Sequence, residues 1–238
     1  MVRATSIAML AVVMPASADT LYSSNGPFGG FFGLWGADVS TSQSVAQRFT
    51  CGIDADLTGA SFWIMNNASQ PGAPITVSIE ADSGTGAASR PSGQALETWT
   101  IATQASGWNP VQHSVVSTAG PQLRAGKKYW FVLRSTAPGG SSPVWNFASS
   151  GQGYTCLTQL DGVTWQSSGL GAGLCMGVTG QPSSPSDLDG DGDVDGADLG
   201  IVLTSWGACS ACGADITGDG MVDGADLGAL LTAWSVGA

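Results

Sequence analysis

The sequence predicts a mainly β protein, in which an antiparallel, jelly-roll-like β-sandwich is followed by a small α-helical module. Three observations predict this fold class. Short runs of alternating apolar and polar residues, separated by turn residues, fill most of the chain. The chain has 35 glycines and only 11% charged residues, a composition typical of β-rich extracellular domains. A duplicated acidic motif then follows, and each copy leads into a helical pattern.

Residues 1–18 have the features of a secretory signal peptide. Arg3 gives a positive start, residues 7–14 form an apolar stretch too short to span a bilayer, and Ala16-Ser17-Ala18 fits the small-x-small cleavage rule. Cleavage there makes Asp19 the first mature residue, so we expect a secreted, extracellular protein. No later stretch is long and apolar enough to predict a transmembrane helix.

Residues 19–178 are predicted to form the β-sandwich domain. Ile75, Val77 and Ile79 alternate with polar residues, as in a strand with one buried face, and this pattern places Glu80 on the solvent-facing side. Regularly spaced short strands with intervening turn residues favour an antiparallel sandwich or jelly roll. Similar runs occur at 44–51, 58–66, 96–102, 111–117, 128–135, 143–148, 154–159 and 173–178.

A Pro/Ser-rich segment, residues 179–186, is predicted to be a linker, and residues 187–238 form the module that follows it. The charge of the chain is concentrated in this module. Ten aspartates lie between Asp187 and Asp226, and the net charge of the whole chain is -11. Because nucleic-acid phosphates require Lys and Arg, and the last basic residue is Arg134, this distribution argues against a nucleic-acid partner.

The module contains an internal duplication in which Asp215 follows Asp187 by 28 residues. Each copy has oxygen-bearing side chains at loop positions 1, 3, 5, 9 and 12 and glycine at position 6, the spacing of an EF-hand calcium loop. Position 7 contributes its main-chain carbonyl, and both loops end in Asp where Glu is usual. We therefore expect two Ca²⁺ ions. The predicted ligands are Asp187, Asp189, Asp191, Asp193, Asp195 and Asp198 in the first loop, and Asp215, Thr217, Asp219, Met221, Asp223 and Asp226 in the second.

An amphipathic helix is predicted after each loop. The apolar residues follow i, i+3, i+4, i+7 spacing, and the pattern repeats in the second copy. Neither loop has a helical pattern before it, so the expected unit is a loop plus one exit helix, twice. The apolar positions are Leu199, Val202, Leu203 and Trp206, then Leu227, Leu230, Leu231 and Trp234.

These two loop–helix repeats resemble a dockerin domain over residues 187–236. The resemblance implies a calcium-dependent module that binds a cohesin-like domain or a surface scaffold protein. Family contacts at loop positions 10 and 11 fall on Gly196, Ala197, Gly224 and Ala225, and their identity in both copies permits docking in two orientations. These positions lack the hydroxyl groups that are usual in the family, and this difference argues against a standard cellulosomal cohesin as the partner. The alternative is a module that folds on calcium and only tethers or stabilises the chain.

The spacing Cys209-Ser-Ala-Cys212 is compatible with a redox motif, half a zinc site or a local disulfide. A local disulfide is favoured, because no βαβ context surrounds the pair and the sole histidine, His113, is distant in sequence. The other cysteines, Cys51, Cys156 and Cys175, are odd in number. One pair among them is plausible, and the sequence does not select it.

The large domain carries no catalytic motif. Its acidic residues form no recognisable carboxylate pair, no G-x-S-x-G is present, and the run from Leu123 to Leu133 resembles a core strand of choice-of-anchor type secreted sandwich domains. We therefore expect a secreted, non-catalytic interaction protein with no catalytic residues. The alternative is a component of extracellular polysaccharide degradation, in which the sandwich binds or hydrolyses a glycan through exposed aromatics. The candidate aromatics are Trp35, Trp108 and Trp165.

Overall fold

The structure is a computed structural model, and the chain divides into two compact units. The β-rich unit spans residues 18–183, and the C-terminal unit begins at residue 184. Residues 1–17 of the expected signal peptide, Trp35 and the predicted ligand Asp191 lie outside the described residues. The structure describes residues 18–24, 26–27, 36–66, 72–84, 89–137, 143–148, 156–159, 164–167, 173–190, 193–209 and 212–234.

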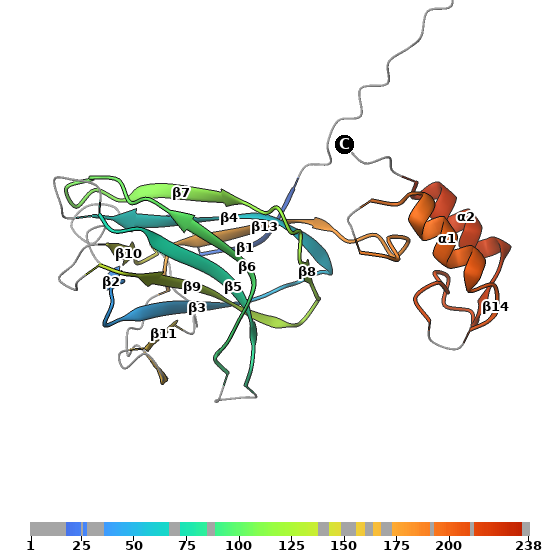
Figure 1. Ribbon diagram of the computed structural model, residues 1–238, viewed down its shortest axis with the longest axis horizontal. Helices are drawn as coiled ribbons and strands as arrows, with labels where there is room; N and C mark the ends of the chain where they lie inside the picture. Colours follow the sequence, from blue (N-terminus) through green and yellow to red (C-terminus); the bar gives the residue numbers. More distant parts are fainter. Residues whose placement is uncertain are drawn as a thin grey trace, which may run out of the picture. The chain divides into compact units, whose positions relative to one another are not determined.

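The β-rich unit consists of two antiparallel sheets (Figure 1). The first sheet has the order β1(Asp19–Ser23), β13(Met176–Pro182), β4(Ala55–Met65), β10(Val144–Asn146) and β2(Gly36–Asp38), and β7(Val111–Val116) and β8(Gln122–Leu123) also pair with β4. The second has the order β12(Trp165–Ser167), β11(Cys156–Gln159), β3(Ser44–Thr50), β9(Lys128–Ser135), β5(Ile75–Asp82) and β6(Pro91–Ile101). The prediction of a mainly β, antiparallel protein is confirmed, and the arrangement is consistent with a sandwich.

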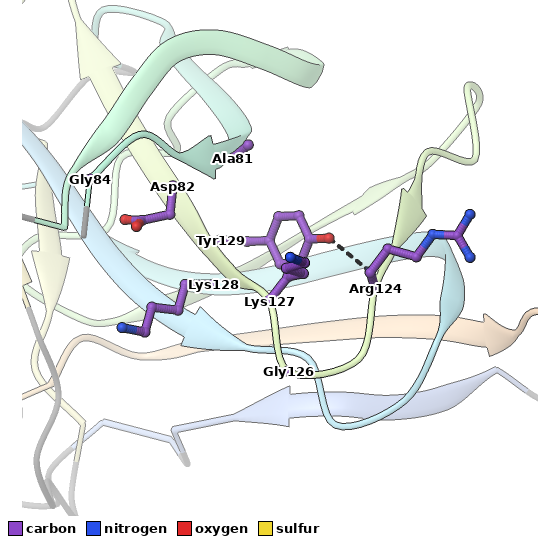
Figure 2. Close-up of a pocket in the computed structure, with 8 residues that line it drawn as sticks. All are labelled: Ala81, Asp82, Gly84, Arg124, Gly126, Lys127, Lys128 and Tyr129. Carbon is purple, nitrogen blue, oxygen red and sulfur yellow. Dashed lines mark hydrogen bonds between the residues drawn. The ribbon is translucent and has the colours of Figure 1, made fainter. Parts of the chain in front are cut away.

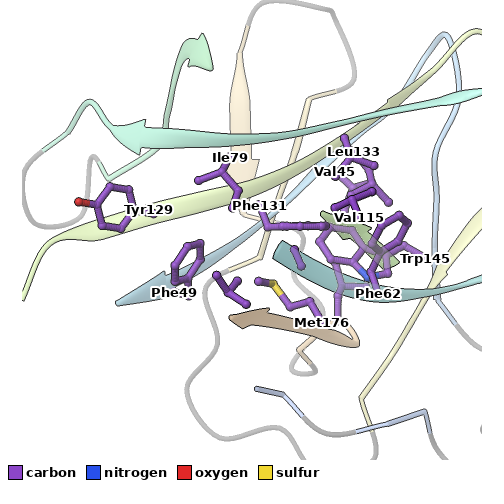
Figure 3. Packing of buried hydrophobic residues seen from close by; sticks show 14 of the residues in the cluster. Val45, Phe49, Phe62, Ile79, Val115, Tyr129, Phe131, Leu133, Trp145 and Met176 are labelled. Carbon is purple, nitrogen blue, oxygen red and sulfur yellow. The ribbon is translucent and has the colours of Figure 1, made fainter. Parts of the chain in front are cut away.

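The main hydrophobic core is built from residues of both sheets (Figure 3). On β9, Phe131 and Leu133 point into this core, whereas the intervening Val132 belongs to a separate cluster, as period-2 alternation requires. The Phe131 ring lies 5.4 Å from Phe62 and 5.5 Å from Trp145, centroid to centroid. All three rings have no exposed surface, so the core is organised around large aromatic side chains.

The opposite face of the second sheet carries a buried polar network. Glu80 is 1% exposed, and its carboxylate accepts hydrogen bonds from Arg134 at 2.8 Å and from the Gly93 N–H at 2.8 Å. The Arg134 guanidinium also lies 5.9 Å from the centroid of the Trp165 ring. The expectation that Glu80 faces solvent is therefore wrong, because its charge is satisfied by an ion pair and a backbone donor inside the protein.

The first half of the predicted linker is part of a strand. Strand β13 continues to Pro182, where Gln181 and Pro182 pair with Asp56 and Ala55 of β4. Proline is tolerated there because it is the last residue of the strand. The pairing extends β13 through residues 179–182, and the boundary between the two units falls after residue 183.

The C-terminal unit contains two helices and a short two-stranded sheet. The elements in chain order are α1(Gly196–Thr204), β14(Gly207–Ala208), β15(Met221–Val222) and α2(Gly224–Thr232). Val202 of α1 and Leu230 of α2 are fully buried in one small core, together with Val194, Ala214 and Val222. Within the described part of the chain, neither helix has the length or apolarity that a bilayer span requires.

Candidate metal centre

The first acidic loop brings three of its predicted ligands together. Asp187, Asp189 and Asp198 each place one carboxylate oxygen so that these atoms all lie within 4.8 Å of one another. Asp198 is fully buried, whereas Asp187 is half-buried and Asp189 is exposed. A group of carboxylate oxygens at this separation is a donor set that a hard cation can bridge, so this loop is a candidate metal site.

Asp198 is held in place by the start of α1. Its Oδ1 accepts hydrogen bonds from the N–H groups of Leu188 at 2.6 Å and Asp189 at 3.2 Å, and its Oδ2 accepts from Asp195 at 2.8 Å. Asp195 is the N-cap of α1, and together the two aspartates form a capping box. The side chain at position 12 therefore fixes the first turn of the helix and the beginning of the loop at once.

The second loop repeats this arrangement around Asp226, which is also fully buried. Its Oδ2 accepts from the Asp223 N–H at 2.8 Å, and its Oδ1 accepts from the N–H and the hydroxyl of Thr217 at 3.0 and 3.1 Å. The N–H of Asp223, followed by that of Thr217, holds the pKa of Asp226 below its ordinary value of 3.8. Asp226 is therefore ionised at neutral pH and Thr217 lies directly beside it.

The remaining acidic side chains of the second loop contact its own backbone. Asp215 accepts hydrogen bonds from Gly218, Asp219 and Gly220 N–H groups at 2.8, 3.0 and 2.8 Å. Asp219 accepts from the Met221 N–H at 2.9 Å. Gly220 occupies loop position 6 with φ of 91°, the left-handed region that glycine adopts without strain. The glycine that the loop spacing requires at position 6 therefore adopts a backbone conformation that other residues rarely adopt.

The residues expected to contact a partner lie on the first turns of the two helices. Gly196 and Ala197 on α1, and Gly224 and Ala225 on α2, are all exposed. The N–H groups of Ala197 and Ala225 donate to the N-cap carboxylates at 2.8 and 2.7 Å, so only their small side chains face outward.

The sequence-based prediction of the helices did not anticipate four large apolar side chains that are exposed. Leu203 and Trp206 are 54% and 51% exposed, and their counterparts 28 residues later, Leu231 and Trp234, are 54% and 39% exposed. All four were expected to lie on buried stripes. We call them the Leu/Trp pairs. Leu203 and Leu231 are exposed because each nine-residue helix buries only one row of side chains, around Val202 or Leu230. Trp206 and Trp234 were predicted to lie on the helices, but the helices end before them, at Thr204 and Thr232.

The cysteines separate into one disulfide and buried thiols. Cys209 and Cys212 are joined in a disulfide, with their Cα atoms 5.8 Å apart. Cys51 and Cys175 are free and buried, and their thiols lie 3.0 Å from the carbonyls of Ile53 and Phe147 respectively. A second disulfide that includes either of them is therefore not formed. The side chain of Cys156 lies outside the described residues.

No protein-family model matches this chain, and no curated protein matches it either. The resemblance to dockerins consequently rests on the spacing of the two loops and their exit helices. Calcium binding and docking stay predictions, and the geometry above is what supports them.

The aromatic candidates of the β-rich unit do not form a common strip among the described residues. Trp108 is half-buried in the loop between β6 and β7, with φ of 70°, and the half-buried Trp165 on β12 has the Arg134 guanidinium 5.9 Å from its ring centroid. The ring of His113 on β7 lies 5.8 Å from that of Phe62, centroid to centroid, and burial lowers the pKa of the His113 imidazole. Packing against core aromatics gives His113 a structural role.

Proposed function

We propose that the C-terminal unit is a dockerin-like module that binds two Ca²⁺ ions and attaches a jelly-roll-like β-sandwich to a cohesin-like domain or a surface scaffold protein. The whole chain is then a secreted, non-catalytic interaction protein. The observation that carries this proposal is the repetition of one buried carboxylate arrangement. Asp198 and Asp226, 28 residues apart, both complete a capping box in the first turn of a helix, and both accept backbone N–H groups from the start of their own loop.

The chemistry of the donors favours calcium. Every predicted side-chain ligand is an oxygen donor, and no histidine or thiol is among them. This set disfavours soft and borderline metals, which prefer thiolate and imidazole ligands. Ca²⁺ accepts six to eight oxygens in a flexible geometry and tolerates main-chain carbonyls such as those of Asp193 and Met221. The loops also suit an ion that neutralises several carboxylates at once, since Asp187, Asp189 and Asp198 lie within 4.8 Å of one another.

Docking is supported by the Leu/Trp pairs. Large apolar side chains that remain exposed mark interaction surfaces when they cluster, and tryptophan is enriched among the residues that dominate binding energy. Their occurrence at equivalent positions in both copies matches the identical Gly-Ala sequence at the two helix starts. A partner that recognises one copy therefore meets the same side chains in the other.

A calorimetric calcium titration of the full chain tests this proposal. We expect two binding events in the native sequence and one in each of Asp198→Asn and Asp226→Asn, because either change removes a charge from one loop only. Asp38→Asn, on β2 of the β-rich unit, is the matched control and should keep both events. Absence of binding at about millimolar calcium, the weak end of the range for extracellular calcium loops, or equal loss in the control, would contradict the proposal.

A further inference from the structure

The β-rich unit contains a basic cleft that the proposed docking function does not use. It has a volume of about 570 Å³ and lies where β5 ends and the turn after β8 leads into β9 (Figure 2). Arg124, Lys127 and Lys128 line it together with Tyr129, and Asp82 is the one acidic residue in its lining. The chain has seven Lys and Arg residues and a net charge of -11, so three of the seven positive charges gather at one site on an acidic protein.

The cleft has an excess of positive charge, with three cationic side chains against the carboxylates of Asp82 and Asp54. Among the residues that the structure describes, neither Lys127 nor Lys128 has a salt bridge. Arg124 lies 3.8 Å from Asp54, but the two side chains are 58% and 49% exposed, so this surface pair is weak. One carboxylate oxygen of Asp82 is already paired, because Oδ1 accepts hydrogen bonds from Trp130 Nε1 at 2.6 Å and from the Ser89 hydroxyl at 2.5 Å.

The turn that carries the cations is fixed by its backbone. The Lys127 N–H donates to the Arg124 carbonyl at 3.1 Å, and the Gly126 N–H donates to the Cys51 carbonyl at 2.8 Å. The Arg124 N–H donates to the Tyr129 hydroxyl at 2.7 Å, which Figure 2 shows as a dashed line. Because these main-chain groups are already paired, the side chains of the turn project from a preorganised frame, and binding does not have to order the loop.

We propose that this cleft binds a small organic oxyanion, a ligand of mono- or disaccharide size that carries sulfate or carboxylate groups. Ammonium and guanidinium groups bind such oxyanions through charge-assisted hydrogen bonds. The volume lies within the usual range of small-molecule pockets and exceeds what a bare inorganic anion fills. The net charge of -11 disfavours anion binding on acidic surfaces of the protein, and the cleft brings three of its seven Lys and Arg residues together.

Calorimetric titration of the full chain, at constant calcium, tests this proposal with four probes: a sulfated disaccharide, a uronic-acid disaccharide, the unsubstituted neutral disaccharide and inorganic sulfate. We expect at least one charged disaccharide to bind and the neutral one not to bind. A chain with both Lys127→Gln and Lys128→Gln should bind the charged probe about tenfold more weakly or worse, because charge-assisted hydrogen bonds are lost. Whichever charged disaccharide binds identifies the anionic group.

Arg48→Gln is the matched control, since Arg48 lies on the neighbouring strand β3 and does not line the cleft. It should change the affinity by no more than about twofold, the size of effect expected from a screened charge outside the site. Thermal melting of each variant checks that the fold is unchanged. The proposal is overturned if the neutral disaccharide binds equally well, if neither charged disaccharide binds, if inorganic sulfate binds as tightly as the sulfated disaccharide, or if Arg48→Gln weakens binding as much as the lysine variant.

Discussion

The β-rich unit and the C-terminal unit bury different kinds of side chain. The core of the β-rich unit contains Phe62, Phe131 and Trp145 with no exposed surface, and apolar burial of this size stabilises a fold without help from ligands. Among its described residues, the C-terminal unit has a core of five small or medium buried apolar residues, and it also buries two carboxylates, Asp198 and Asp226. A unit this small with so little apolar core needs an additional source of stability, such as a metal or a disulfide. A cation bound by the acidic loops, as proposed above, would supply this stability.

The largest effect expected of a single substitution is in the β-rich unit. Phe131→Ala removes a ring that contacts both Phe62 and Trp145, and we expect a loss of about 3–5 kcal/mol in the free energy of unfolding. Chemical denaturation followed by a probe in each unit measures it. The helices of the C-terminal unit should melt as in the unchanged protein, and Leu203→Ala, at an exposed position, should leave both transitions in place. Equal destabilisation of both units by Phe131→Ala would contradict their independence.

A smaller effect is expected from the disulfide of the C-terminal unit. Replacing Cys209 and Cys212 by Ser opens a very short loop, for which chain entropy predicts a loss of about 2 kcal/mol. This loss should appear in the melting of α1 and α2 and leave the β-rich unit unaffected. Thermal melting with and without calcium distinguishes how much the disulfide and the calcium ions each contribute to the stability of the C-terminal unit. If removal of the disulfide changes nothing at any calcium concentration, the small core is sufficient without it.

A third effect is absent at neutral pH and grows as the pH rises, and it also distinguishes the two units. Burial raises the pKa of the Cys175 thiol to about 12 from an ordinary 9.0, and burial also raises that of Cys51. Between pH 9 and 12 the unfolded chain loses the Cys175 proton and the folded chain keeps it, so the stability of the β-rich unit falls as the pH rises. In Cys175→Ala the fall with pH should be shallower. Unfolding titrations of both proteins across this window measure the two slopes, and identical slopes would contradict a buried, protonated Cys175.

The sequence predicted the elements whose residue pattern is strong. The alternation in Ile75, Val77 and Ile79 identified β5, and similar runs identified β3, β4, β7 and β9. Strands β1, β2, β8 and β12 were missed, because they have only two to five residues and too few alternations to show a period. Glu80 was misplaced for a related reason, since polar residues on an outward strand face are expected in water unless a distant partner such as Arg134 is known.

The candidate metal site was also predicted only in part from the sequence. Loop spacing alone brought Asp187, Asp189 and Asp198 into one predicted group, and the structure places them within 4.8 Å of one another. The spacing could not reveal that the carboxylates at position 12 are buried and accept the N–H of the helix N-cap residue, since this depends on how each loop folds back on α1 or α2. Nor could the spacing show that Leu203 and Leu231 are exposed, because burial depends on which helix face finds a neighbour. The basic cleft was also missed, as Asp82 and Lys128 are distant in sequence.

The most direct test of the central claim is hydrogen exchange of the full chain with calcium and after its removal by a chelator. The amides of Leu188, Thr217, Asp195 and Asp223, which donate to Asp198 and Asp226, report the state of the two loops. We predict that chelation removes the protection of these amides and leaves the amides of β9 protected. If calcium is first present at a thousandfold excess over its Kd, the free energy of opening each loop should fall by about 4 kcal/mol on chelation. Unchanged protection of the loop amides, or equal loss in β9, would contradict the account.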